Sequence, residues 1–223
     1  MSIDSMTAPT TTSSPHGPAP KVAAIAAVAV GIGLFMTVAA INVPHEASDG
    51  ELVTWWKDSG NRMAGLVSCL FAVVVAVALP VVLNHLREMP RATRSPQWLA
   101  FASSMAAATS ALWLVTGASR ASIGHLVDVM DEPLPGVDVL RFVTATNYTL
   151  LGLPGMAVLG LTIAAVSVVV LRTGALAKWV GVVGAVAAAI TLVAVVAQFG
   201  AYTTPLAIIW SFCLAVGIWR QPA

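Results

Sequence analysis

Charged residues are scarce in this chain: 9% of its 223 residues are charged, whereas 58% are hydrophobic. A soluble domain usually carries about 25% charged residues. Ten acidic residues and 11 Lys and Arg cannot cover a folded chain of this length without leaving large apolar patches in contact with water. The composition therefore excludes a soluble globular enzyme, a nucleic-acid-binding protein and a disordered protein.

Cysteine and alternating polarity are lacking as well. Cys69 and Cys213 are the two cysteines of the chain, and both lie in apolar runs, which excludes a disulfide framework. A transmembrane β-barrel needs many segments of about ten residues in which polar and apolar residues alternate. This chain has long continuous apolar runs instead, so the remaining class is a helical membrane protein with several spans.

Six apolar runs have the roughly 20 residues that a helix needs to cross the hydrocarbon core of a bilayer. The sequence therefore predicts an all-α membrane protein, a six-transmembrane-helix bundle with spans at 22–43, 63–83, 98–117, 149–171, 178–196 and 201–219. Pro80 and Pro154 are predicted to kink the second and fourth spans. Residues 1–20 are rich in Ser, Thr, Pro and Ala and are predicted to form a disordered cytoplasmic tail.

The distribution of Lys and Arg predicts that both termini are cytoplasmic, because basic residues concentrate in cytoplasmic loops. On the predicted inner side, two acids, Asp4 and Glu88, stand beside seven basic residues: Lys21, Arg87, Arg91, Arg94, Arg172, Lys178 and Arg220. The predicted outer side has four basic residues, Lys57, Arg62, Arg120 and Arg141. It has eight acids: Glu46, Asp49, Glu51, Asp58, Asp128, Asp131, Glu132 and Asp138.

The two outer segments, 44–62 and 118–148, are longer than the inner loops and are the predicted location of any binding or catalytic site. Residues 51–57 have room for two turns of an interfacial helix, with Trp55 and Trp56 among the lipid headgroups. Residues 122–130 are predicted to form a short amphipathic helix, and 137–142 to begin the next one.

Six residues on this face are candidate ligand-binding residues: Trp55, Trp56, Asn61, Arg62, Arg120 and Asn147. Arg62, Arg120 and Asn147 lie at the outer ends of the second, third and fourth spans. They are predicted to converge at one mouth of the bundle, where charge-assisted hydrogen bonds hold a lipid phosphate or a carboxylate. The alternative is that each arginine caps its helix or reaches the interface and pairs with Asp58, Asp128 or Asp131.

No metal site and no cofactor are predicted. His45, Glu46, Asp49 and His125 match no tight spacing of metal ligands, and the two histidines come from different loops. The middle of each predicted span lacks Asp, Glu, Lys, Arg and His, which argues against a proton-coupled carrier.

Three functions agree with this pattern. The leading hypothesis is a non-enzymatic membrane protein that binds a lipid or a partner protein through its outer loops. The second is a membrane enzyme acting on a lipid or isoprenoid in the manner of integral-membrane terpene cyclases. Such an enzyme needs a carboxylic acid with a raised pKa, for which the candidates are Glu51, Asp58, Asp128 and Asp131. The third is a facilitator or transporter of a small neutral solute.

Small residues four positions apart recur along the predicted spans, as at Ala29 and Gly33 and at Gly160 and Ala164. Such pairs allow helix backbones to approach closely in lipid. They predict either seams within the bundle or the face of a homo-oligomer, and the sequence leaves both open. Membrane lipids, another membrane protein and a second copy of the chain are the predicted partners.

Three features resemble an uncharacterised family of six-helix integral membrane proteins of actinobacteria. They are the Ser/Thr/Pro-rich segment before the first span, GNRMAGLVS at 60–68 and LRTGALAKWVGVVG at 171–184. The resemblance covers about 22–219. It implies a six-span topology in the plasma membrane of an actinobacterium, and it implies no mechanism because the family has no established activity.

Overall fold

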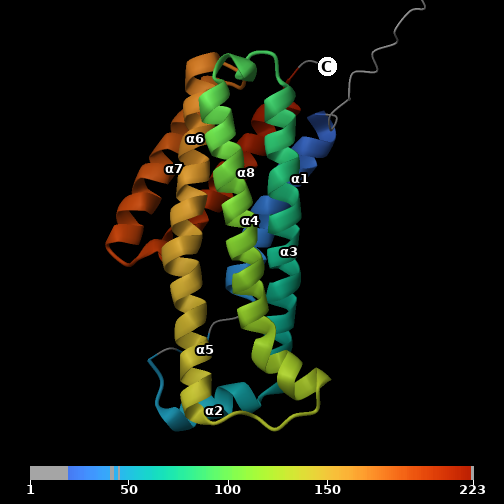
Figure 1. The fold of residues 1–223 in the computed structure, drawn as a ribbon, viewed down its shortest axis with the longest axis vertical. Helices are drawn as coiled ribbons and strands as arrows, with labels where there is room; N and C mark the ends of the chain where they lie inside the picture. The colour runs from blue at the N-terminus through green and yellow to red at the C-terminus, as the bar shows by residue number, and fades with distance from the viewer. Residues whose placement is uncertain (1–19, 41–42, 45, 222–223) are drawn as a thin grey trace, which may run out of the picture.

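The computed structural model describes residues 20–40, 43–44 and 46–221, and this part of the chain is a helical bundle without strands (Figure 1). The long helices are α1 (Pro20–Ala39), α3 (Ser59–Glu88), α4 (Pro96–Gly124), α6 (Met156–Thr173), α7 (Lys178–Val196) and α8 (Thr204–Trp219). The shorter elements are α2 (Asp49–Lys57), α5 (Val137–Leu150), the 3-10 helices η1 (Ala92–Arg94) and η4 (Gly200–Thr203), and the π-helices η2 (His125–Val129) and η3 (Leu151–Gly155).

Six helical segments of the described chain are long and apolar enough to cross a membrane, which confirms the all-α, six-span fold class. They are Pro20–Ala39, Ser59–Glu88, Pro96–Val129, Val137–Thr173, Lys178–Val196 and Gly200–Trp219. The predicted tail at 1–20 lies outside the described residues except for Pro20, which begins α1, and His45 also lies outside them.

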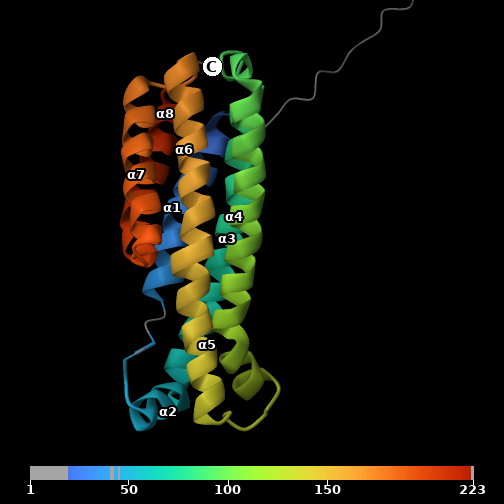
Figure 2. The ribbon, with the colours of Figure 1, turned by 60° about the vertical axis from the view of Figure 1, so that its left-hand side comes forward.

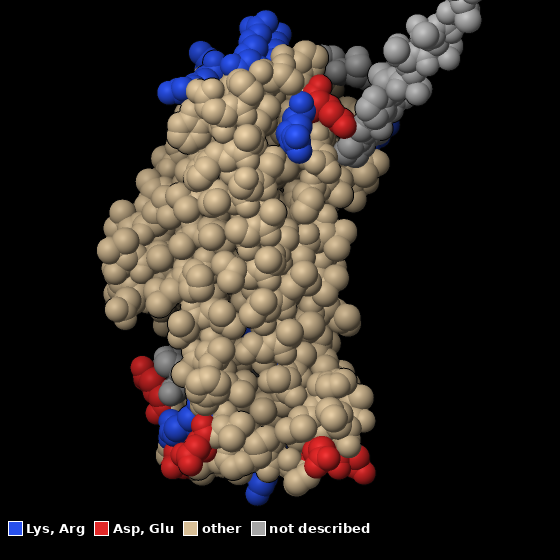
Figure 3. Space-filling view, in the orientation of Figure 1, with Lys and Arg blue, Asp and Glu red and all other residues tan. Residues whose placement is uncertain are grey.

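Charged side chains gather at the two ends of the bundle, with an uncharged band between them (Figure 3). One end, here named the basic end, holds the α3–α4 and α6–α7 connections, the start of α1 and the end of α8 (Figure 1). The opposite end, named the acidic end, holds α2 and the α4–α5 connection. The residues that the sequence assigns to a basic inner side and an acidic outer side therefore lie at opposite ends of the bundle.

The helices of the described chain differ greatly in length. At about 1.5 Å per residue, the 19 residues of α7 and the 20 residues of α1 extend for about 30 Å, close to the thickness of a bilayer core. Val137–Thr173, with 37 residues, extends for about 55 Å. The hairpin formed by α7, η4 and α8 ends well short of the acidic end (Figure 2). The acidic end is thus a cap that projects beyond the shorter helices.

Glycines allow the close helix contacts inside the bundle. A Cβ on Gly33 of α1 would meet the backbone of Phe71 in α3, and a Cβ on Gly160 of α6 would meet Leu192 of α7. Gly200 of η4 lies against the carbonyl of Gly152 in η3, which fixes where the hairpin ends along the long helix. These small-residue seams therefore join helices of one chain.

The predicted helix boundaries need correction at the acidic end. The sequence predicts a separate amphipathic helix at 122–130, but α4 continues without a break through Gly124 into η2. Likewise, α5, η3 and α6 form one continuous segment, in which Pro154 lies in the π-helix. The apolar runs stop earlier than the helices because the helical backbone extends beyond the part whose side chains contact lipid.

Candidate binding site at the acidic end

Helix α2 begins with two reciprocal hydrogen bonds between Ser48 and Glu51. The backbone N–H of Ser48 donates to the Glu51 carboxylate at 2.9 Å, and the backbone N–H of Glu51 points at the Ser48 hydroxyl oxygen at 3.5 Å. The Ser48 hydroxyl also donates to that carboxylate at 2.8 Å. Because these bonds favour the charged form, the Ser48 side chain and backbone lower the pKa of Glu51 below its ordinary 4.5. Glu51 is thus an exposed, ionised helix cap.

The turn from α2 into α3 is held by Asp58 and Asn61. The Asp58 carboxylate accepts from the backbone N–H of Asn61 at 3.0 Å and caps the start of α3. The Asn61 side-chain amide donates to the Trp55 carbonyl at 2.9 Å. Both side chains therefore satisfy backbone groups at adjoining helix ends.

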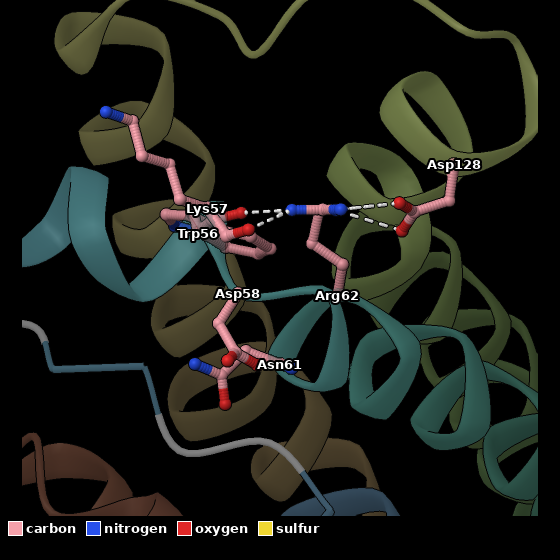
Figure 4. Close-up of polar contacts among 6 residues, drawn as sticks. All are labelled: Trp56, Lys57, Asp58, Asn61, Arg62 and Asp128. Carbon is pink, nitrogen blue, oxygen red and sulfur yellow. Dashed lines mark hydrogen bonds and ion pairs between the residues drawn. The ribbon is translucent and has the colours of Figure 1, made fainter.

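Arg62 fastens three elements together (Figure 4). Its Nε donates to both carboxylate oxygens of Asp128 in η2, at 2.9 and 3.0 Å, and one terminal nitrogen donates to the same group at 2.6 Å. The other terminal nitrogen donates to the carbonyls of Trp56 and Lys57, at 2.9 and 2.7 Å. The guanidinium thus caps the end of α2 and ties it to the end of the α4 segment.

Trp56 forms the centre of a small apolar cluster beneath α2. Its side chain is 0% exposed and packs with Val43, Leu52, Ile123 and Leu140. The prediction that Trp56 lies among lipid headgroups is therefore wrong, because α2 turns this ring toward α4 and α5. Trp55 is only partly buried and contacts the Trp56 ring edge-on, with 4.9 Å between ring centroids.

A groove beside α2 is bordered by Trp55 and by the segment before the helix. Its volume is about 990 Å³. The lining residues are Val43, Pro44, Glu46, Ala47, Ser48, Gly50, Glu51, Thr54 and Trp55. Volumes of this order are typical of sites that hold small organic ligands. Of the described residues that line the groove, two are acidic and none is Lys or Arg.

Arg120 lies inside the bundle rather than at an open mouth, with 5% of its surface exposed. One terminal nitrogen donates to the Thr37 carbonyl of α1 and, at 3.4 Å, to the Ser68 hydroxyl of α3. The Ser68 hydroxyl donates to the same Thr37 carbonyl at 2.8 Å. The Nε of Arg120 is buried and has no hydrogen-bond partner among the described residues.

Asn147 lies near Arg120 and is also buried, with 3% of its surface exposed. Neither its amide nitrogen nor its amide oxygen has a hydrogen-bond partner within the described chain. Arg120, Asn147, Tyr148 and Val43 line a cavity of about 10 Å³, measured as space for the centre of a water-sized molecule. The Tyr148 hydroxyl donates to the Val43 carbonyl at 2.8 Å. The structure thus brings together Arg120 and Asn147, two of the candidate ligand-binding residues. The third residue predicted at this mouth, Arg62, bonds Asp128 instead.

Thr37, Ser68 and Tyr148 are not among the site residues that the sequence predicts. Thr37 and Ser68 are single hydroxyl side chains within apolar runs. Because a hydroxyl in a span usually bonds its own helix or a neighbour, such positions carry a weak signal for a polar contact between helices. The signal becomes specific only once α4 is known to place Arg120 beside them.

The four candidate catalytic carboxylates are dispersed over the cap. Glu51 and Asp58 are helix caps, and Asp128 is bonded to Arg62. Asp131 is exposed, with φ of 57° in the connection after η2. Protonation of an alkene requires a carboxyl whose pKa is raised, whereas the contacts of Glu51 lower its pKa. In the described part of the chain, no three His, Cys, Asp or Glu side chains lie close enough together to hold a metal ion.

Comparisons of this chain with protein-family models, with curated proteins and with solved structures find no match.

Proposed function

We propose that this protein is a multi-pass plasma-membrane protein that binds a lipid in the groove beside α2, with both termini in the cytoplasm. The observation that carries the proposal is the groove itself, about 990 Å³ in volume, at the end of the bundle that projects beyond the α7–η4–α8 hairpin. Lys and Arg concentrate at the opposite end, which supports an acidic end that faces away from the cytoplasm.

The height of the groove along the bundle favours a lipid as its occupant. The tip of the hairpin exposes Val196, Phe199 and Tyr202, and tyrosine is enriched where a membrane meets water. Figure 2 shows α2 and the segment that leads to it beyond this tip. A groove at that height lies at or just above the headgroups of the surrounding lipids.

The chemistry of the groove favours a headgroup that carries an amine. Glu46 and Glu51 supply carboxylates, and the ionised state of Glu51 is favoured by Ser48. Val43, Pro44 and Trp55 supply an apolar wall. An ammonium group is attracted by the carboxylates, while the glycerol and upper acyl carbons of the same lipid pack against Trp55.

Native mass spectrometry of the full-length protein in detergent tests this proposal. The probes are phosphatidylethanolamine and phosphatidylglycerol with the same acyl chains. We expect phosphatidylethanolamine to bind more tightly. Trp55→Ala should weaken its binding about tenfold, because the apolar wall is lost while the buried Trp56 is kept. Glu51→Gln keeps an amide that caps α2 but removes the charge, and should weaken binding about two- to fivefold.

Trp219→Ala is the matched control, since Trp219 is an exposed tryptophan at the basic end. This variant should bind both lipids as the wild type does. Equal affinity of the wild type and Trp55→Ala for phosphatidylethanolamine would contradict the proposal.

A further inference from the structure

A second site is suggested by the buried positive charge of Arg120. Buried charges in proteins are normally paired, because removing an ion from water is costly when no opposite charge replaces the solvent. Within the described residues, the ion pairs that the structure gives join Arg62 to Asp128 and Arg141 to Asp49. Among the described residues, Arg120 contacts a carbonyl and a hydroxyl, but no carboxylate.

Two residues that line the cavity beside Arg120 carry hydrogen-bond donors without a protein acceptor among the described residues. The Nε of Arg120 and the amide nitrogen of Asn147 are both buried and unpartnered in the described chain. Leaving a buried donor unsatisfied is unfavourable, so native structures place a protein group, a water molecule or an ion at such positions. The two residues that carry these donors come from different helices, α4 and α5, and both line one small cavity.

We propose that this cavity binds one small monoatomic anion of the size of chloride. The cavity has about 10 Å³ for the centre of its occupant, which is room for a single water-sized species. A phosphate or a carboxylate group has several heavy atoms and does not fit. A water molecule fits and satisfies the donors, but it leaves the charge of Arg120 without a counterion. A chloride ion accepts from both donors and also balances that charge.

This anion site is distinct from the lipid groove in its chemistry. The groove is lined by Glu46 and Glu51, whereas the cavity is lined by Arg120, Asn147, Tyr148 and Val43. An anion in the cavity contacts residues of α4 and α5 and, through Arg120, is linked to α1 and α3. Its binding therefore stabilises the packing of four helices at the base of the cap.

Thermal unfolding of the full-length protein in detergent tests the proposal. Sodium chloride is compared with sodium gluconate at equal ionic strength, since gluconate is too large for the cavity. We expect chloride to raise the Tm in a saturable way, by about 5 to 10 °C at a concentration 100 times its dissociation constant. Identical Tm values in the two salts would overturn the proposal and indicate water in the cavity.

Asn147→Asp is the decisive variant, because it places a fixed carboxylate beside Arg120 and removes one donor to the anion. We expect this variant to fold and to lose the difference in Tm between chloride and gluconate. Arg94→Gln removes an exposed charge at the basic end and should keep the full difference. If Asn147→Asp also keeps the full difference, chloride acts elsewhere and the proposed site is wrong.

Discussion

Two arginines at the acidic end have opposite surroundings, although both lie close to the end of an apolar run. Arg62 is satisfied by Asp128 and by two carbonyls at the end of α2. Arg120 is buried between helices and has no carboxylate partner within the described chain. The first side chain stabilises the cap, whereas the second is available to a small anion.

Arg62→Lys tests the structural role of the first arginine. Lysine keeps the positive charge, but it cannot bond both oxygens of Asp128 and two carbonyls at once. We expect a loss of about 2 kcal/mol in the free energy of unfolding, measured by reversible SDS unfolding in mixed micelles. Arg141→Lys is the control, because Arg141 pairs with Asp49 on the surface, and it should cost less than about 1 kcal/mol. Equal losses of unfolding free energy in both variants would show that the bonds of Arg62 to Asp128 and to the end of α2 do not stabilise the cap.

At the scale of single elements, α2 is a short helix whose start depends on an ionised side chain. The pKa of Glu51 lies below its ordinary 4.5 because Ser48 hydrogen-bonds the carboxylate. The stabilisation is therefore complete above the unfolded pKa and is lost as the pH falls through the lower pKa of the folded state. The N-terminal turn of α2 should loosen in acid before the long helices do.

Hydrogen exchange of the α2 amides between about pH 6 and pH 3, corrected for the intrinsic pH dependence, measures this loosening. In the wild type, protection should fall at the acid end of this range. In Glu51→Gln, the cap does not titrate, so protection should change little with pH. A pH profile that is the same in both proteins would contradict the role of Glu51.

At the scale of the whole molecule, the sequence predicts the number of spans but not the extent of the helices. The predicted span at 178–196 coincides with α7, since this helix ends where its apolar run ends. The predicted span at 98–117 is too short, because α4 continues through polar residues into the cap. Hydropathy identifies the residues that contact lipid, whereas the capping and packing that prolong a helix depend on other segments.

Contacts between distant segments also explain why the sequence predicts the candidate site only in part. The sequence predicts Arg62, Arg120 and Asn147 at one mouth of the bundle because each lies at the end of an apolar run. In the structure Arg120 and Asn147 line one cavity, whereas the Arg62 guanidinium bonds Asp128, which lies 66 residues later in the chain. The burial of Arg120 depends on α1 and α3, which supply the Thr37 carbonyl and the Ser68 hydroxyl. Such contacts join distant segments and leave no local pattern.

The orientation of the whole bundle decides which compartment the groove faces, and it is predicted from charge alone. Seven of the 11 Lys and Arg belong to the predicted inner side, and eight of the ten acids to the outer side. Thr93 and Glu132 are exposed residues at the basic and acidic ends, respectively. Cys69 and Cys213 are first replaced by alanine. A single cysteine is then placed at position 93 or 132, and its reaction with an impermeant maleimide in intact cells reports which end of the bundle faces outward.

We expect Glu132→Cys to react in intact cells and Thr93→Cys to react only after the cells are permeabilised, because basic residues remain on the cytoplasmic side. Labelling of both variants after permeabilisation is the control for access to the thiol. The reverse pattern in intact cells would place the acidic end in the cytoplasm. The lipid groove and the anion site would then lie at the inner leaflet, and the proposed orientation, with both termini in the cytoplasm, would be wrong even if both sites bind as described.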